Sequence, residues 1–376
     1  MQIGFLHGFY QGAMSTSTDN RPAKRPTMSG LLVILGVNFV VLLIGLVFLE
    51  VIFGSWFLPY LPPHSVVVDR TFKYRQRLYE PPGEIIYTRD RYALRGVKEP
   101  LRDIQMVTLG GSTTDQKYIT EGETWQDVLR GMAQVRVANA GVDGMSSSGH
   151  LVSLNDWLHK LPDFGPQIYL HYIGINDAAA TEGRSGDRRG STSWSRSIRQ
   201  RSAVVRTTVN LLVLLRRPPV VSHMRIPPSQ WAQYDLHVAK TDVARARNYI
   251  EQVYRPNVRA ILDLHEPRGE KAIFVSQPSH PSLMERIDGA VHIRIPDLAP
   301  MAIVLPMVNE TTEAVCGEKP NICRFFDVAR SVQFAPSDFY DAVHTTPAGS
   351  RRIGNFLAAE LKRLEDGWLP RLAHGR

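Results

Sequence analysis

The feature that most constrains this chain is an uncharged run of apolar residues near its N-terminus. Residues 30–49 are GLLVILGVNFVVLLIGLVFL, with Asn38 as the one strongly polar side chain. At about 1.5 Å rise per residue, a helix of this length spans about 30 Å, the thickness of a bilayer's hydrocarbon core. A helix that is apolar on every face is not expected on the surface of a water-soluble domain. The run therefore predicts one transmembrane helix, over residues 30–53.

Charges before this helix predict its orientation. Arg21, Lys24 and Arg25 precede it, and basic residues mark the cytoplasmic side of a membrane span. Residues 1–29 are therefore expected to be a cytoplasmic tail of a single-pass membrane protein, and the rest of the chain extracytoplasmic, or periplasmic in a bacterium. A cleaved signal peptide is the alternative. The apolar run is longer than most signal peptides have, and residues 53–56 lack a small-x-small cleavage site.

The positive charge of the chain is local. Its net charge is +8, but residues 181–225 hold ten arginines against Glu182 and Asp187, and the remainder balances. This distribution argues against a nucleic-acid-binding protein, whose basic residues would be spread over a larger surface. Ile198, Val205, Val209 and Leu212 follow helical spacing inside the segment. We expect a basic helical insertion that caps the main domain, lies on anionic lipid, binds an acidic polymer or simply packs on the core.

The chain has two cysteines, Cys316 and Cys323. Outside the cytoplasm such a pair predicts a disulfide that closes the intervening turn. A metal site is a weaker interpretation, because no further histidine or cysteine lies close to this pair in the sequence. Two unpaired buried thiols are the third possibility.

From residue 101 onward, short apolar runs alternate with helical patterns. Five runs have the composition of buried strands: residues 104–109, 135–139, 167–173, 271–276 and 323–328. Strands that alternate with helices predict a parallel sheet covered on both faces. We therefore expect a three-layer α/β/α sandwich with a flavodoxin-like sheet over residues 101–370. Residues 54–100 are expected to form a loosely structured approach segment between membrane and domain.

Polar residues gather where these strands end, which in a parallel sheet is the edge that carries active sites. Ser112 follows the first strand, Gly141 the second and Asn176 the third, while Asp341 and His344 lie near the chain end. A serine hydroxyl becomes a nucleophile when a base accepts its proton and a carboxylate orients that base. His344 and Asp341 fit these roles. The N–H groups of Ser112 and Gly141 and the amide of Asn176 would stabilise an oxyanion.

This set resembles the SGNH, or GDSL-like, hydrolase superfamily, whose four sequence blocks supply Ser, Gly, Asn and His. The blocks here are GGST, NAGVDG, GIND and DAVH, and the resemblance extends over residues 104–364. It implies a serine esterase in which Ser112, Asp341 and His344 are catalytic and Ser112, Gly141 and Asn176 form the oxyanion hole. One departure is Gly111, where the GDSL pattern has an acidic residue.

Three further residues are possible substrate-lining positions: Gly111, Asp177 and His280. His171, within a strand, is expected to be a buried core histidine. The first strand end lacks the second glycine and the lysine of a phosphate loop and the spacing of a dinucleotide site. Thr114 stands where the α/β-hydrolase elbow has its last glycine.

The sequence thus predicts an enzyme that cleaves or transfers an acyl ester, with acetyl as the expected group and a cell-surface glycan as the expected carrier. It needs no metal or organic cofactor for this chemistry and binds no nucleic acid. A polysaccharide O-acetyltransferase would use the same residues, with a membrane-bound acyl-transfer partner possible. A lipase at the membrane surface and an inactive glycan-binding scaffold are also compatible with the sequence.

Overall fold

The computed structural model describes residues 28–60, 62, 68–96, 99–182, 198, 201–214, 218–222, 226–364 and 368. The chain divides into two units, residues 1–52 and 53–376, which are described separately. Several basic residues around α1 and the basic insertion lie outside the described ones: Arg21, Lys24, Arg25, Arg199, Arg216 and Arg217.

The first unit contains helix α1, Met28–Phe53. The predicted apolar helix is therefore present, and it begins two residues before the apolar run. Its most apolar 18-residue stretch has a mean hydropathy of 3.0, and none of the helix's residues is buried. It is long and apolar enough to cross a membrane, a property that a signal sequence shares.

The second unit is built around a five-stranded parallel sheet. Its strands are β3 (Met106–Gly110), β4 (Val137–Asn139), β5 (Ile168–Tyr172), β8 (Lys271–Val275) and β11 (Cys323–Phe326). The spatial order is β11-β8-β5-β3-β4. In chain order this is the 2-1-3-4-5 arrangement of flavodoxin-like sheets. The predicted fold class is confirmed.

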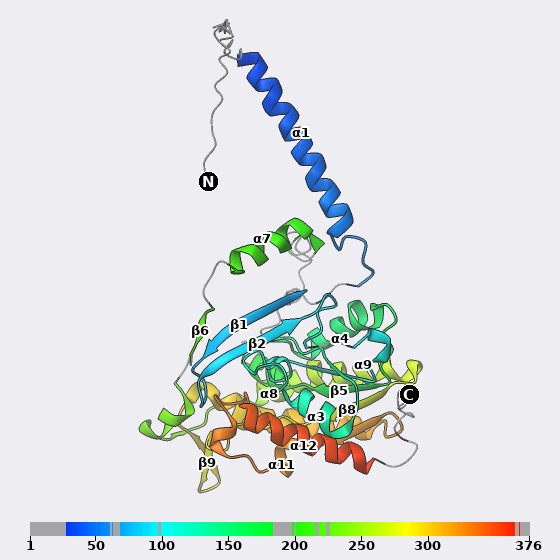
Figure 1. The fold of residues 1–376 in the computed structure, drawn as a ribbon. Helices are drawn as coiled ribbons and strands as arrows, with labels where there is room; N and C mark the ends of the chain where they lie inside the picture. Colours follow the sequence, from blue (N-terminus) through cyan, green and yellow to red (C-terminus); the bar gives the residue numbers. More distant parts are fainter. Residues whose placement is uncertain are drawn as a thin grey trace, which may run out of the picture. The chain divides into compact units, whose positions relative to one another are not determined.

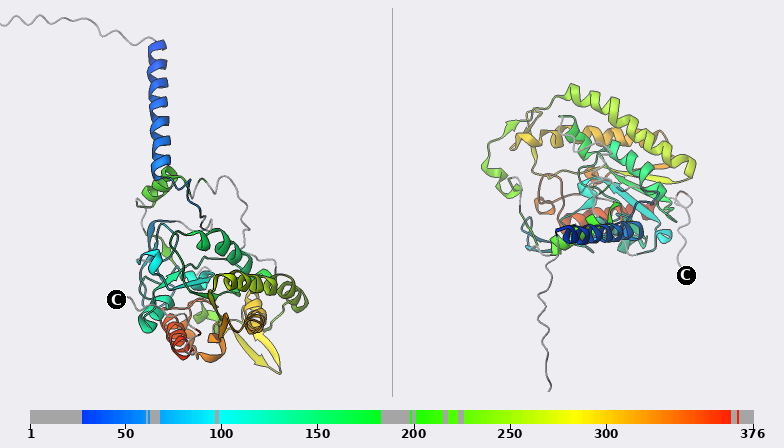
Figure 2. Two further views of the ribbon diagram at one scale, coloured as in Figure 1. Left: turned by 90° about the vertical axis from the view of Figure 1, so that its right-hand side faces the viewer. Right: turned by 90° about the horizontal axis from the view of Figure 1, so that it is seen from above.

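Alternate strand residues build two cores, one on each face of the sheet. In β5, Ile168, Leu170 and Tyr172 pack with residues of α3 (Trp125–Ala133) and α12 (Pro347–Arg363). Tyr169 packs on the other face, with α4 (Ser147–Asp156), α9 (Arg255–His265) and α10 (Ala299–Gly317). Figure 1 shows these helices on opposite sides of the central strands, and the second view in Figure 2 shows α9 and α12 apart. Strand side chains alternate between faces, so both patterns follow from the pleat.

The remaining elements are shorter. They are α2 (Ser112–Asp115), α5 (Ile175–Ala180), α7 (Ala203–Leu214), α8 (Val243–Tyr249), α11 (Val328–Ser331), β7 (His237–Val238), β9 (Met284–Ile287) and β10 (Ala290–Ile293). A π-helical turn, Ile250–Tyr254, joins α8 to α9.

The expectation of a loose approach segment is wrong for residues 70–89. They form an antiparallel hairpin of β1 (Arg70–Gln76) and β2 (Gly83–Arg89), which β6 (Val220–Val221) extends from the basic insertion. The inward positions alternate as strand pleating requires and include Tyr74, Ile85 and Tyr87. Two other inward positions are Gln76 and Arg89. Polar residues on the buried face conceal the two-residue hydrophobic pattern.

Arg89 fastens this hairpin to the main domain. Its guanidinium donates to Asp115 Oδ1 at 2.6 Å, to the Gly141 carbonyl at 2.5 Å and to the Ala93 carbonyl at 2.6 Å. Both members of the Arg89–Asp115 ion pair are buried, at 1% and 4% side-chain exposure. The cost of burying each charge is therefore offset by its attraction to the other.

Two other predicted features are present in the second unit. Cys316, at the end of α10, and Cys323, at the start of β11, form a disulfide. Within the basic insertion, α7 covers part of the predicted amphipathic helix. Leu211 and Leu212 on it are exposed rather than packed on the core.

We predict that Arg89→Met lowers the free energy of unfolding by about 3–5 kcal/mol, because it leaves the Asp115 carboxylate buried without its partner. The melting temperature should fall by roughly 10 °C, measured on the full-length protein in detergent. Lys73→Met is the matched control. It removes the exposed Lys73–Glu84 pair of the same hairpin and should cost less than about 1 kcal/mol. Equal melting temperatures for the two variants would show that the hairpin is not held as described.

Candidate active site

The candidate site lies at the carboxyl ends of β3 and β5, where the strand order changes direction. Ser112 begins α2, two residues after the end of β3, and Asn176 lies in the first turn of α5, after β5. The two strands are direct neighbours in the sheet. Ligands of doubly wound sheets bind at such a switch point. The topology thus brings together the two residues that the first and third sequence blocks supply.

Three side chains form a continuous hydrogen-bonded chain at this edge. Ser112 Oγ lies 2.7 Å from His344 Nε2, and His344 Nδ1 lies 2.7 Å from Asp341 Oδ2. The second carboxylate oxygen, Asp341 Oδ1, accepts from the backbone N–H groups of Val343 and His344 at 2.9 and 2.8 Å. These contacts fix the carboxylate, and the carboxylate fixes the imidazole. The arrangement has the geometry of a serine–histidine–aspartate triad.

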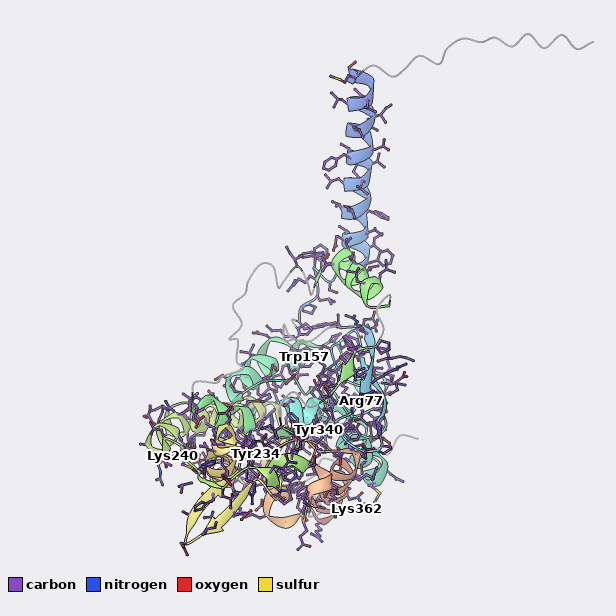
Figure 3. All side chains as sticks on the ribbon, turned by 90° about the vertical axis from the view of Figure 1, so that its left-hand side faces the viewer. Arg77, Trp157, Tyr234, Lys240, Tyr340 and Lys362 are labelled. Atoms are coloured by element: carbon purple, nitrogen blue, oxygen red, sulfur yellow. A yellow bond between two sulfur atoms is a disulfide. The ribbon has the colours of Figure 1, made fainter. Side chains whose placement is uncertain are left out.

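The loop that carries the histidine is itself fixed. Tyr340 N–H donates to the His344 carbonyl at 3.0 Å, which closes the turn. The Tyr340 ring stacks on the imidazole, with centroids 5.6 Å apart and planes 8° from parallel. Tyr340, which is labelled in Figure 3, is buried. The imidazole is therefore held against a rigid aromatic face.

Opposing effects set the pKa of His344. Burial by itself lowers the pKa of this imidazole, but the charge of Asp341, its hydrogen bond and the charges of Asp143 and Asp115 together raise it above the ordinary value. Burial likewise raises the pKa of the Asp341 carboxyl, and the charge and hydrogen bond of His344 outweigh that effect and lower it. The pair therefore favours a charged histidine beside a charged aspartate, as a general base requires once it has taken a proton.

Gly111 and Asn176 fit closely against each other. A Cβ at residue 111 would lie 2.2 Å from Asn176 Nδ2, which is closer than any side chain allows. The same amide nitrogen donates to the Met145 carbonyl at 2.9 Å. An amide nitrogen carries two hydrogens, so a second one remains for a substrate. Glycine at residue 111 thus leaves room for the Asn176 amide beside Ser112, rather than lining a substrate pocket by itself.

The predicted oxyanion role of Gly141 is not supported. Its N–H donates to Asn139 Oδ1 at 2.8 Å and its carbonyl accepts from Arg89. A Cβ here would lie 2.3 Å from the backbone nitrogen of Asp115, so the glycine allows close packing of this loop on α2. Gly141 therefore supports the site through its packing on α2, and its N–H is already bonded to Asn139. A tetrapeptide match in the sequence could not reveal this hydrogen bond.

Of the other two predicted lining residues, one is placed differently. Asp177 is fully buried, and its carboxylate accepts from the Ser147 backbone and hydroxyl at 3.0 and 2.6 Å and from Tyr249 at 3.2 Å. It therefore joins α5 to the start of α4 and does not line a substrate pocket. His280 packs against Trp231, with ring centroids 4.8 Å apart. It lines a groove of about 940 Å³ that also borders Tyr340.

Gln277 is a site-supporting residue that the sequence patterns did not single out. Its side chain accepts from the Ile175 N–H at 2.6 Å and donates to Thr113 Oγ1 at 2.8 Å and to the Tyr172 carbonyl at 3.1 Å. It therefore connects the loops after β3, β5 and β8. The available signal was a polar residue directly after a buried strand, a position that favours functional groups in parallel sheets.

Comparison with known proteins gives distant similarities. No family model and no curated protein matches the chain. Among solved structures, it is similar to a catalytic mutant of Axe2, an acetylxylan esterase from Geobacillus stearothermophilus. The identity is 13% and the TM-score 0.41, over 71% of this chain and 96% of that one. It is also similar to a member of the lipolytic protein G-D-S-L family from Veillonella parvula, with 16% identity and a TM-score of 0.38, over 69% and 100% of the two chains. Similarities this distant leave the function to be argued from the residues of this chain.

We predict that ester hydrolysis has an acidic limb in kcat/KM that lies above pH 6.5, the ordinary pKa of histidine, because only neutral His344 accepts a proton and its pKa is raised. Asp143→Asn removes one of the charges that raise this pKa, so the limb should move to lower pH. Asp143 is exposed, so salt screens its charge and the shift should be small and should shrink further at high ionic strength. The measurement is a pH–rate profile, with Asp163→Asn as the control for an exposed aspartate elsewhere. A limb that moves upward or stays in place in Asp143→Asn would contradict this electrostatic account.

Proposed function

We propose that this protein is a serine esterase of the SGNH type that cleaves an acyl ester, with Ser112 as its nucleophile. One observation carries the proposal: the 2.7 Å contacts that connect Ser112 Oγ, His344 and Asp341 in series at a sheet edge. Each contact has the length of a strong hydrogen bond. The serine is also the first residue of its helix, so its own N–H has no acceptor within that helix.

In the proposed mechanism Ser112 Oγ attacks the acyl carbonyl as His344 Nε2 takes the hydroxyl proton. The tetrahedral intermediate collapses when His344 returns that proton to the departing alcohol oxygen, which leaves an acyl group on Ser112. A second hydroxyl, from water in a hydrolase, then attacks the acyl-enzyme with His344 again acting as the base. Asp341 holds the imidazole and stabilises its charged form throughout.

The oxyanion would be held by the Ser112 N–H, the second Nδ2 hydrogen of Asn176 and the backbone of Gly144. Gly144 replaces Gly141 in this role for two reasons. Its neighbour Asp143 acts on the pKa of His344, and its other neighbour, Met145, accepts from Asn176. Gly144 also has φ of +76°, a conformation that favours glycine. Donors fixed before the reaction supply most of the stabilisation of such intermediates.

The groove beside Tyr340 supports a glycan as the carrier of the acyl group. Aromatic and charged side chains line it together: Tyr79, Trp231, Tyr340, Glu80, Glu123, Arg294 and Arg351. Its volume of about 940 Å³ is at the upper end of ordinary ligand pockets. Aromatic faces and hydrogen-bonding groups together suit sugar rings, which present both C–H faces and hydroxyls. We propose an acetylated oligosaccharide or polysaccharide as the substrate class.

Anchoring of the enzyme at the outer side of a membrane is part of this proposal. It is supported by the apolar helix α1, by the Cys316–Cys323 disulfide and by the basic residues before α1 in the sequence. Enzymes held there would meet glycans during export. An esterase and an O-acetyltransferase differ in what accepts the acyl group: water in an esterase, and a sugar hydroxyl in an O-acetyltransferase.

We predict that Ser112→Ala lowers kcat for 4-nitrophenyl acetate by at least about 10⁴-fold, because no other group in the triad can form the acyl-enzyme. The melting temperature should stay within a few degrees of wild type. Ser331→Ala, which changes an exposed serine of α11, is the control and should keep full activity. Undiminished hydrolysis by Ser112→Ala would refute the assignment of the nucleophile.

We further predict that free acetate is the main product when the full-length protein receives an acetyl ester and a neutral or an anionic oligosaccharide. Water reaches an acyl-enzyme wherever no acceptor occupies the groove. Mass spectrometry of the sugars and an assay of free acetate measure the two products, and Ser112→Ala sets the background. If acetylated sugar exceeds free acetate, the protein is a transferase and the hydrolase assignment is wrong.

A further inference from the structure

A buried cluster of histidine and glutamate lies away from the proposed active site. His159 comes from a 3₁₀ turn (Leu158–Lys160), His265 ends α9 and Glu270 immediately precedes β8. Trp157, labelled in Figure 3, marks the chain just before this turn. Since β8 begins at Lys271, Glu270 stands at the amino end of the parallel sheet. The proposed catalytic residues stand at the carboxyl end, so neither the triad nor its supporting residues use this cluster.

The ligand atoms of these three side chains converge. Glu270 Oε2 lies 3.3 Å from His159 Nε2 and 2.7 Å from His265 Nδ1. All three residues offer a ligand atom within 4.8 Å of the others. Zinc bonds of about 2.0–2.1 Å in a tetrahedron place ligand atoms roughly 3.3 Å apart. The 3.3 Å between Glu270 and His159 already matches this value. The 2.7 Å between Glu270 and His265 would have to lengthen by about 0.6 Å.

His159 lacks the hydrogen bonds that would explain it as an ordinary core residue. Its side chain is only 7% exposed, and within the described part of the chain neither ring nitrogen has a hydrogen-bond partner. Nε2 does lie 3.3 Å from Glu270 Oε2, a contact 0.6 Å longer than the one that His265 makes with the same oxygen. Leaving a buried polar group unsatisfied costs about 1–3 kcal/mol. A bound cation would remove that cost for Nε2.

His265 has the outer contact typical of a metal ligand. Its second ring nitrogen, Nε2, lies 2.9 Å from Nε2 of His171 in β5. If Nδ1 binds a metal, the Nε2 proton is available for donation to His171. Metal-binding histidines nearly always donate their other ring N–H in this way. The side chain of Glu270 is 12% exposed, which leaves a short path for an ion from solvent.

We propose that His159, His265 and Glu270 form a divalent transition-metal site, with zinc as the preferred ion. Two imidazoles and one carboxylate are a common zinc ligand set, and a water completes the tetrahedron. The ion would connect the turn after α4 to the end of α9 and the start of β8, which lie about a hundred residues further along the chain. Because it lies at the amino edge of the sheet, away from Ser112, the ion would hold these elements together and take no part in the proposed ester chemistry. The expectation that the chemistry needs no metal concerns the other edge of the sheet and is unaffected.

The test uses full-length protein in detergent, freed of metal by a chelator, given Zn²⁺ and passed through a desalting column. Metal analysis should find roughly one zinc per chain, and the melting temperature should rise with zinc. His159→Gln and Glu270→Gln should each weaken zinc binding at least about 10-fold and abolish the rise in melting temperature. His159→Gln keeps a polar side chain that can still reach Glu270, so it should fold. His237→Gln, an exposed histidine of β7, is the control and should behave as wild type.

Co²⁺ in place of Zn²⁺ gives a readout independent of activity, since tetrahedral coordination produces strong visible absorption. We expect that absorption in wild type and His237→Gln and its loss in the two ligand variants. A wild-type chain that retains no zinc, or equal retention by wild type and His159→Gln, would overturn the proposal. Neither result bears on Ser112, because hydrolysis of 4-nitrophenyl acetate by the zinc-free protein tests the proposed function separately.

Discussion

The buried ion pair of Arg89 and Asp115 is the interaction on which the rest of the second unit depends. Asp115 ends the short helix that Ser112 begins, and Arg89 also donates to the carbonyl of Gly141 in the loop after β4. One guanidinium therefore connects the N-terminal hairpin, the serine helix and a loop of the site. Because each charge is costly to bury alone, the hairpin is part of the folded domain rather than a tether that leads to it.

The position of the candidate site follows from the order of the strands in the parallel sheet. Parallel strands place their following loops at one edge, and the 2-1-3-4-5 order puts the loops after β3 and β5 side by side. Gln277 ties those loops to the end of β8, and Tyr340 holds the imidazole from the last loop of the sheet. The serine, the amide of Asn176 and the histidine thus come from three separate segments. Each is held by contacts that take no part in bond breaking.

The sequence predicted those features that depend on local pattern. Buried strands are nearly uniform in composition, so all five were found within two residues. Ser112 was singled out because it follows the first strand, and Asp341 and His344 because of their spacing near the chain end. The hairpin was missed because its inward face carries Gln76 and Arg89, which obscure the alternation. The oxyanion role predicted for Gly141 conflicts with the hydrogen bond from its N–H to Asn139, a contact that only coordinates reveal. The same is true of His159 and His265, which are far apart in sequence and become neighbours only when α9 packs on the sheet.

The most direct test of this account is covalent labelling of the full-length protein with a fluorophosphonate, followed by peptide mapping. An active serine displaces fluoride and keeps the phosphonyl group, whereas an ordinary serine does not react. The account predicts one adduct per chain on the peptide that contains Ser112, and loss of labelling in His344→Ala, which lacks the base. An unlabelled wild-type protein, or an adduct on another serine, would contradict it.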